Sequence, residues 1–302
     1  MSELIPGTEY GPLDNPNFEF AWRRGYLEAH LLSDLGKKRQ NNEDACIMCA
    51  PKNPDLAVER GLLFSVADGM GGASAGEYAS RMALLTLSHE YYARPFESVP
   101  VSLRAAVECA NAKIHEEAES NLAYAGMGTT VSAAVVLGDW LYIAQVGDSR
   151  VYLLRERSGI HQLTDDHSLV EEQVRSGLIS PEEAKNHSLK NLITRAVGIK
   201  AQVSVDLFSL RMQQGDTLLI CSDGLSNMVT DSQISTTLSG ADLKVATHRL
   251  IENALDGGGT DNVTAVTIRV VDAPPRTEQQ GGAKEIAIQS NGFFSRLRKL
   301  FY

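Results

Sequence analysis

The stretch around which this chain is organised reads Phe64-Ser65-Val66-Ala67-Asp68-Gly69-Met70-Gly71-Gly72. It opens as an apolar run typical of a buried strand. Directly after Asp68 it passes into glycines, which the interior of a regular strand or helix disfavours. A carboxylate is therefore held at a strand end whose neighbouring backbone can approach a small ligand. Mg²⁺ and Mn²⁺ take oxygen ligands, and Asp68 together with the Gly69 carbonyl can offer two. The stretch predicts a metal site centred on these two residues.

Composition bounds the class of protein. The chain has 302 residues, 43% of them hydrophobic and 22% charged, which is typical of a soluble globular protein with a large core. The formal net charge of −10 gives a nucleic-acid partner no electrostatic support. No apolar run reaches the length of about eighteen residues that a membrane helix needs. The first residues lack a basic segment leading into an apolar one. We therefore expect a cytoplasmic protein that binds no nucleic acid.

The cysteines do not predict a disulfide framework or a zinc site. There are four, Cys46, Cys49, Cys109 and Cys221, which is sparse for a chain of this length. Cys46 and Cys49 form a C-x-x-C pair, but no second pair stands by to complete a zinc site. On a strand the two thiols would face opposite sides. We interpret them as structural or incidental thiols.

Periodicity predicts a mixture of strands and helices. Residues 1–24 are rich in Gly and Pro and predict an irregular N-terminal arm. Apolar and β-branched runs predict strands over residues 26–33, 45–50, 131–137, 140–146, 151–154, 203–210, 217–222 and 263–270. Helical spacing of apolar residues predicts helices over residues 74–92, 102–121 and 241–255, with Pro95 and Pro100 ending the first of them.

Two further segments stand apart from the main domain, which we place at residues 25–271. Residues 168–198 are polar and helix-prone, with Ser180 as a helix N-cap and Pro181 at the first helical position. This flap either selects substrates or simply covers a sheet edge. Residues 272–302 predict a linker followed by a short basic amphipathic tail. The tail either contacts a membrane surface or a partner, or is disordered or packed on its own domain.

Acidic residues recur at the predicted strand ends. They are Asp44, Asp68, Asp148, Asp223 and Asp261. A single Asp-Gly pair commonly closes a turn, so any one of them alone is explained by turn chemistry. Gathered in a partly buried site without cations, several carboxylates would repel one another strongly. The repetition therefore favours a shared metal centre over separate turns.

The ordered set of motifs resembles the PPM (PP2C) family of metal-dependent serine/threonine phosphatases, and its bacterial branch most closely. The motifs that carry the resemblance are Arg39-Gln40-Asn41-Asn42-Glu43-Asp44, Val66-Ala67-Asp68-Gly69-Met70-Gly71-Gly72, Gly126-Met127-Gly128-Thr129-Thr130, Gly147-Asp148-Ser149-Arg150, Leu163-Thr164-Asp165-Asp166-His167-Ser168, Ser222-Asp223-Gly224-Leu225 and Thr260-Asp261-Asn262. They follow the family's order over most of the chain.

The resemblance implies a fold and a set of roles. The fold would be α+β, a four-layer α-β-β-α sandwich of two antiparallel sheets flanked by helices. Asp68 would bridge two Mn²⁺ or Mg²⁺ ions, with the Gly69 carbonyl on one ion and Asp223 and Asp261 on the other. Asp44 would act through metal-bound water. Asp148 and Asp223 would form a weaker third site. Arg39 would bind the substrate phosphate, and Glu43 and Asn262 would support the ligands.

The implied reaction is hydrolysis of phosphoserine and phosphothreonine in proteins by a metal-activated bridging water. This reaction needs no covalent phosphoenzyme. Phosphate monoesters hydrolyse extremely slowly without a catalyst, and paired cations both generate hydroxide and neutralise phosphoryl charge. Met70 stands where some eukaryotic members carry a proton-donating His, so metal-bound water would protonate the leaving group. Phosphoproteins and a Ser/Thr kinase of the same cell are the expected partners. The alternative is a catalytically silent phosphoprotein-binding pseudophosphatase.

Overall fold

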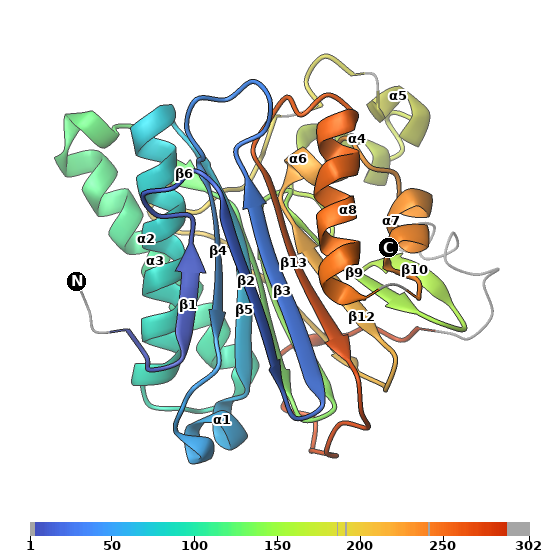
Figure 1. The fold of residues 1–302 in the computed structure, drawn as a ribbon. Coiled ribbons are helices and arrows are strands. Elements are labelled where there is room, and N and C mark those ends of the chain that lie inside the picture. Colours follow the sequence, from blue (N-terminus) through green and yellow to red (C-terminus); the bar gives the residue numbers. More distant parts are fainter. Residues whose placement is uncertain (1–3, 186, 191, 241, 289–302) are drawn as a thin grey trace.

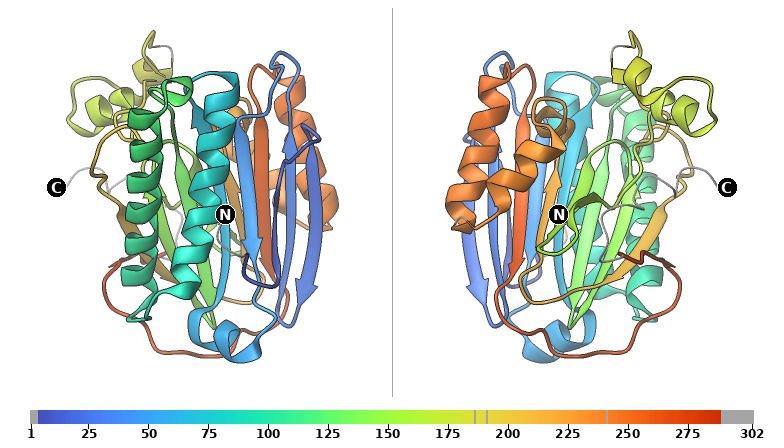
Figure 2. Two further views of the ribbon diagram at one scale, coloured as in Figure 1. Left: turned by 90° about the vertical axis from the view of Figure 1, so that its left-hand side faces the viewer. Right: turned by 90° about the vertical axis from the view of Figure 1, so that its right-hand side faces the viewer.

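A computed structural model describes residues 4–185, 187–190, 192–240 and 242–288 of the chain. Two packed β-sheets form its centre, and helices cover the outer face of each (Figure 1). The layers therefore follow the order helix, sheet, sheet, helix, which confirms the predicted α-β-β-α sandwich. Side views show the helical layers on opposite sides of the two sheets (Figure 2).

The first sheet carries the central sequence stretch. Its strand order is β1 (Thr8–Gly11), β4 (Asp44–Cys49), β5 (Leu62–Met70), β7 (Val131–Leu137), β8 (Trp140–Val146), β11 (Asp206–Arg211) and β14 (Lys284–Glu285), with the short β6 (Gly128–Thr129) paired to β5. Neighbouring strands are antiparallel except β11 and β14. The β7 and β8 strands are buried on both faces, which explains their nearly unbroken apolar sequence.

The second sheet packs face to face against the first. Its strand order is β10 (Gly159–Gln162), β9 (Arg150–Arg155), β12 (Thr217–Cys221), β13 (Val263–Val270), β3 (Leu27–Asp34) and β2 (Phe18–Arg24). Phe64 and Val66 of the first sheet pack with Leu31 and Val266 of the second in the core between the sheets. This apolar layer holds the strand ends of both sheets in a fixed relation, as a site built from both sheets needs.

Helices cover the two outer faces. The helices are α1 (Pro54–Arg60), α2 (Ala73–Ala93), α3 (Val99–Ser120), α4 (Leu169–Arg175), α5 (Pro181–Lys185), α6 (Asp223–Ser226), α7 (Asp231–Leu238) and α8 (Leu243–Asp256), with a 3₁₀ turn at Leu122–Tyr124. Helices α2 and α3 pack on the first sheet, and α8 packs on β3 and β13 of the second. Among the described residues, no helix is both long and apolar enough to cross a membrane.

The prediction of an irregular N-terminal arm is wrong. Residues 1–24 contain β1, which pairs with β4, and β2, which pairs with β3 along its whole length. Phe18, Phe20 and Trp22 alternate with polar or small residues and pack against the core between the sheets. This period-2 alternation was the available signal, and the surrounding Gly and Pro residues obscured it.

Predictions for a proline, the C-terminal linker and a helix cap have mixed outcomes. Pro100 does not end a helix but lies in the first turn of α3, where its missing N–H costs nothing, and Ser98 caps that helix. Residues 272–288 are not a free linker, because Thr277 donates to Asp139 and β14 pairs with β11. Ser180 does cap the flap helix, exchanging hydrogen bonds with Glu183. The basic tail lies outside the described residues.

The two cysteines of the C-x-x-C pair occupy opposite faces of β4, as predicted. Cys46 packs in the core between the sheets, whereas Cys49 packs in the core beneath α2 and α3. Both are buried free thiols. Burial raises the pKa of the Cys49 thiol to about 11, with hydrogen bonds from Thr8 and Tyr92 opposing the shift. These thiols are therefore protonated packing residues at neutral pH.

Candidate metal centre and active site

The five aspartates of the sequence motifs are brought to one end of the sandwich. Asp44 begins β4 and lies directly opposite Asp68 near the end of β5. Asp148 lies in the turn between β8 and β9, Asp223 follows β12, and Asp261 lies in the loop two residues before β13. Because β4, β5 and β8 belong to one sheet and β12 and β13 to the other, only the packing of the two sheets assembles the group.

Electrostatics show that these carboxylates interact. Burial raises the pKa of Asp68 well above its usual value, and Asp44, Asp223, Asp148 and Asp261 each raise it further. Burial also raises the pKa of Asp44, Asp148 and Asp223, and in each case a neighbouring carboxylate adds to the shift. Like charges at a buried site disfavour ionisation. Without bound cations, the centre resists carrying its full negative charge.

The residues fit divalent cations of the Mg²⁺ and Mn²⁺ class. The side-chain donors are carboxylate oxygens, which such hard cations prefer. The Oδ1 atom of Asp148 is buried and has no hydrogen-bond partner among the described residues, so it is free to bind an ion. Within the described ranges, no three of these carboxylates bring oxygens within 4.8 Å of one another.

Close backbone packing explains the glycine at position 69. The Gly69 N–H donates to the Glu43 carbonyl at 3.1 Å. A Cβ atom here would lie 2.1 Å from the Gly76 carbonyl oxygen and 2.6 Å from that of Glu43. No side chain fits, so the strand end can pass close to the start of α2 only with glycine. At the predicted Asp68-Gly69 centre, close packing therefore requires glycine at position 69.

A shell of hydrogen bonds orients the acids. Ser222 Oγ donates to Asp44 Oδ2 at 2.7 Å, and Thr130 Oγ1 accepts from the Asp68 backbone N–H at 2.9 Å. The Asn262 side chain accepts from the Glu43 N–H at 2.8 Å and donates to two loop carbonyls. Asn262 therefore ties the loop carrying Arg39 and Glu43 to the loop carrying Asp261.

Arg39 lies at the exposed rim of the acidic centre. Its Nη2 donates to Asp261 Oδ2 at 2.8 Å, and its Nη1 lies 3.9 Å from Glu43 Oε1. The guanidinium is half-exposed. The residue predicted to bind the substrate phosphate thus pairs here with a predicted metal ligand.

Some residues around the centre had motif positions in the sequence but no assigned role. Arg150 donates bidentately to the Asp166 carboxylate, from Nε to Oδ1 and from Nη2 to Oδ2. His167 accepts from the Gly147 N–H through Nδ1 and forms a hydrogen bond with Asp206 through Nε2. It therefore braces the turn that carries Asp148. The contacts of Ser222 and Thr130 give no periodic signal in sequence, because each joins segments distant along the chain.

A cavity of about 400 Å³ adjoins the centre at Met70. Residues that follow the flap helices form most of its wall, among them Ile193, Arg195, Ile199 and Lys200. Its lining combines apolar side chains with two cations. The end of the flap segment and the residues after it therefore line a cavity that Met70, next to the acidic centre, also lines.

Comparison with known proteins identifies the family. The profile of the family described as Protein phosphatase 2C matches residues 36–253. The serine/threonine phosphatase stp of Listeria monocytogenes is 40% identical over 247 residues, covering 80% of this chain and 95% of that protein. The Mycobacterium tuberculosis phosphatase PstP is also 40% identical, over 240 residues, but the match covers only 44% of that longer protein.

Solved structures agree with the sequence match. The crystal structure of M. tuberculosis PstP/Ppp has 39% sequence identity and a TM-score of 0.71, covering 81% of this chain and 98% of that one. The PstP catalytic domain in complex with two manganese ions has 39% identity and a TM-score of 0.69, covering 82% and 99%. With the family profile spanning most of the chain and the fold reproduced, this chain belongs to the protein phosphatase 2C family.

Proposed function

We propose that this protein is a metal-dependent phosphatase that hydrolyses phosphoserine and phosphothreonine in other proteins. The observation that carries the proposal is the convergence of five buried or partly buried aspartates from both sheets, with a half-exposed arginine at their rim. Family membership and a relative that holds two manganese ions support the same reaction.

The proposed ligand set is the one that the family resemblance implies, and the position of the acids at one end of the sandwich supports it. Asp68 and the Gly69 carbonyl would serve the centre of the cluster, Asp223 and Asp261 its second-sheet side, and Asp148 a further site. Asp44 would contribute from directly opposite Asp68. Bound Mn²⁺ or Mg²⁺ supplies Lewis acidity toward the phosphoryl group and lowers the pKa of water. The roles of Ser222, Glu43 and Asn262 would be to hold the ligands at fixed angles.

Arg39 would exchange partners during binding. In the described state its guanidinium neutralises Asp261. With Asp261 neutralised by a bound cation, the planar pair of N–H donors of Arg39 would be available to phosphate oxygens. The cavity beside Met70 would then receive residues flanking the phosphorylated side chain. The phosphate and the peptide would then occupy adjoining sites.

The protein's place in the cell is a narrower part of the proposal. A protein phosphatase acts on phosphoproteins, and we infer that this one reverses the action of a Ser/Thr kinase in the cytoplasm. The basic tail, which lies outside the described residues, retains its two alternatives of membrane or partner contact and of disorder or self-packing. We expect no nucleic-acid substrate, given the net charge of −10.

Hydrolysis of a small aryl phosphate and of a phosphothreonine peptide tests the proposal. We expect activity with Mn²⁺ that EDTA abolishes and that Asp223→Asn reduces by several orders of magnitude. The matched control is Asp14→Asn, which removes an exposed carboxylate outside the centre. A wild-type protein that binds the phosphopeptide with Mn²⁺ present but releases no phosphate would instead indicate the pseudophosphatase.

A further inference from the structure

A second cluster of potential metal ligands lies on the helix-facing side of the second sheet. Glu19 comes from β2, His30 from β3 and His248 from α8. In the register of β2 and β3, Ala21 lies opposite His30 and Glu19 lies opposite Leu32, so Glu19 and His30 project from the same face. Leu32 packs in the core beneath α8, which identifies that face. The cluster contains none of the aspartates of the acidic centre.

The three side chains converge on one carboxylate oxygen. Glu19 Oε1 lies 3.1 Å from His30 Nε2 and 3.1 Å from His248 Nε2. The three ligand atoms all lie within 4.8 Å of one another, and among the described residues no other group of three His, Cys, Asp or Glu side chains meets this distance. Zinc bonds of about 2.0–2.2 Å place tetrahedral ligand atoms roughly 3.2–3.6 Å apart. Only small side-chain shifts would be needed to admit an ion.

The ammonium group of a lysine already contacts this cluster. Lys244, one helical turn before His248 on α8, places its Nζ 2.8 Å from the same Glu19 oxygen. The Glu19 carboxylate is therefore shared between the Lys244 ammonium and the two imidazoles.

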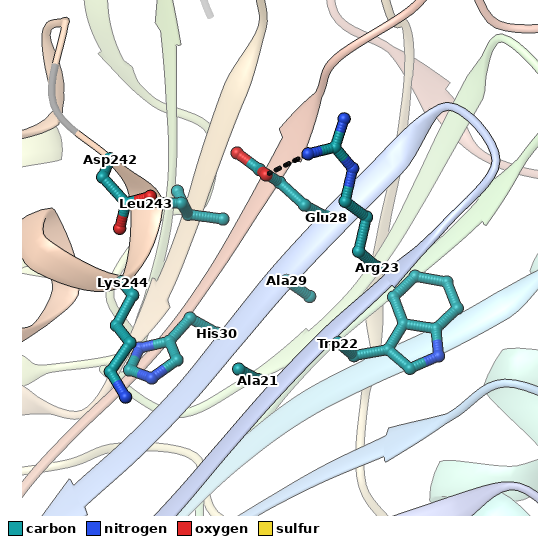
Figure 3. A pocket seen from close by; sticks show the side chains of 9 residues that line it. All are labelled: Ala21, Trp22, Arg23, Glu28, Ala29, His30, Asp242, Leu243 and Lys244. Carbon is teal, nitrogen blue, oxygen red and sulfur yellow. Dashed lines mark ion pairs between the residues drawn. The ribbon is translucent and has the colours of Figure 1, made fainter.

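A surface pocket reaches the cluster at His30. His30 and Lys244 line a surface pocket of about 240 Å³, together with Glu28 and Asp242 (Figure 3). The side chain of His30 is only 1% exposed, whereas those of Glu19 and His248 are 38% and 39% exposed. One ligand is thus fixed by burial while two can adjust. Water from the pocket can complete a shell of three protein ligands.

We propose that Glu19, His30 and His248 form a binding site for a transition-metal ion of the zinc class, from which the Lys244 ammonium is displaced. Two imidazoles and one carboxylate favour Zn²⁺ and its neighbours, whereas the all-oxygen centre at the strand ends favours Mg²⁺ or Mn²⁺. The ion would join the edge strand β2 to β3 and α8 and so stabilise that side of the sandwich.

Two features set the expected strength of the site. Displacing Lys244 breaks its ion pair with Glu19, which opposes ion binding. In addition, His30 Nδ1 is buried with no partner among the described residues. Metal-ligating histidines usually donate their second N–H to an acceptor. The site should therefore bind more weakly than a structural zinc site, and removing Lys244 should tighten it.

Zinc titration of the full chain against a chromophoric chelator tests the site, with millimolar Mg²⁺ present to saturate the carboxylate centre. We expect one Zn²⁺ per chain. Loss of a direct ligand in His248→Gln should weaken binding by about tenfold or more, since even outer-shell changes cost that much. Lys244→Gln should tighten binding severalfold. The visible spectrum of bound Co²⁺ should show the same order of variants.

His89→Gln is the matched control, because His89 also lies on a helix, with Nδ1 3.6 Å from Glu90 Oε1, but belongs to no such trio among the described residues. It should bind Zn²⁺ as the wild type does, and Mn²⁺-dependent phosphatase activity should confirm that all variants are folded. Equal Zn²⁺ affinity in the wild type and His248→Gln would overturn the assignment. So would failure of both the wild type and Lys244→Gln to bind Zn²⁺.

Discussion

Arg39 and Asp261 form an ion pair at the rim of the acidic centre, with Nη2 2.8 Å from Oδ2. The two residues are 222 positions apart in the chain. The pair joins the residue proposed to bind phosphate to a residue proposed to bind a cation. Metal binding and substrate binding should therefore be coupled through this contact.

Replacing Arg39 tests that coupling. Arg39→Ala removes charge-assisted hydrogen bonds to phosphate, so kcat/KM for a phosphopeptide should fall by about 10- to 100-fold. The Mn²⁺ concentration needed for half-maximal activity should fall as well, because Asp261 loses a competing cation. Arg39→Lys should recover only part of kcat/KM, since an ammonium cannot form the bidentate contact. An Ala variant with wild-type kcat/KM would exclude a phosphate-binding role.

Replacing Asp148 should reduce activity less than replacing Asp223. The Asp148 carboxylate should also destabilise the metal-free protein. Its Oδ1 is buried and has no hydrogen-bond partner in the part of the chain that the structure describes. Burial, followed by the Asp223 charge, raises the pKa of Asp148. In EDTA, Asp148→Asn should raise Tm because it removes a repelling carboxylate. With Mn²⁺, the same variant should need more metal for full activity. Thermal unfolding in both buffers measures the effect, and a lower Tm in EDTA would contradict it.

Gly69→Ala should disrupt the centre sterically. The added methyl group would approach the Gly76 carbonyl to 2.1 Å, so β5 or α2 would have to shift. Overpacking of this kind costs about 1–3 kcal/mol, and activity should be lost at the same time. Denaturant unfolding and Mn²⁺-dependent turnover measure the two effects. Gly281→Ala is the control, because a Cβ atom there meets nothing within 4 Å; equal behaviour of the two variants would refute the steric argument.

Met70→His should not increase the rate strongly. Met70 follows the central Asp68-Gly69 pair and lines the adjoining cavity, so a histidine there could offer a proton only by replacing an apolar wall. We expect activity near that of the wild type, or a changed pH profile, when kcat is measured across pH 6 to 9. A large rise in kcat would show that leaving-group protonation limits this protein.

Asp206 should anchor the flap in a pH-dependent way. Burial alone would raise its pKa, but hydrogen bonds from His167 and Arg195 outweigh it and lower the pKa to about 2. A carboxyl with a depressed folded-state pKa contributes stability that is present above its unfolded value of about 3.9 and is lost as pH falls through about 2. Asp206→Asn should thus lower Tm by a constant amount between pH 5 and 8, and the difference should shrink below pH 4. A difference that grows in acid would have the wrong sign.

Local sequence patterns predicted much of the fold. The strand over residues 263–270 matches β13 at both ends, and those over 131–137 and 140–146 match β7 and β8. These strands are long, β-branched and bounded by turn residues, so local preference and burial agree. The strands β1 and β10 were missed because each is short and lies at or near a sheet edge.

The sequence by itself determined which residues could form the acidic centre, because the motifs fix both the residue types and their order along the chain. Only the tertiary structure decided which side chains meet. Asp44 and Asp68 face each other through strand register, and Arg39 reaches Asp261 through the packing of two loops. Glu19, His30 and His248 become neighbours only when β2, β3 and α8 assemble. The reason is physical: periodicity reports the faces of one element, whereas the pairing of elements depends on the apolar surface that the whole chain buries.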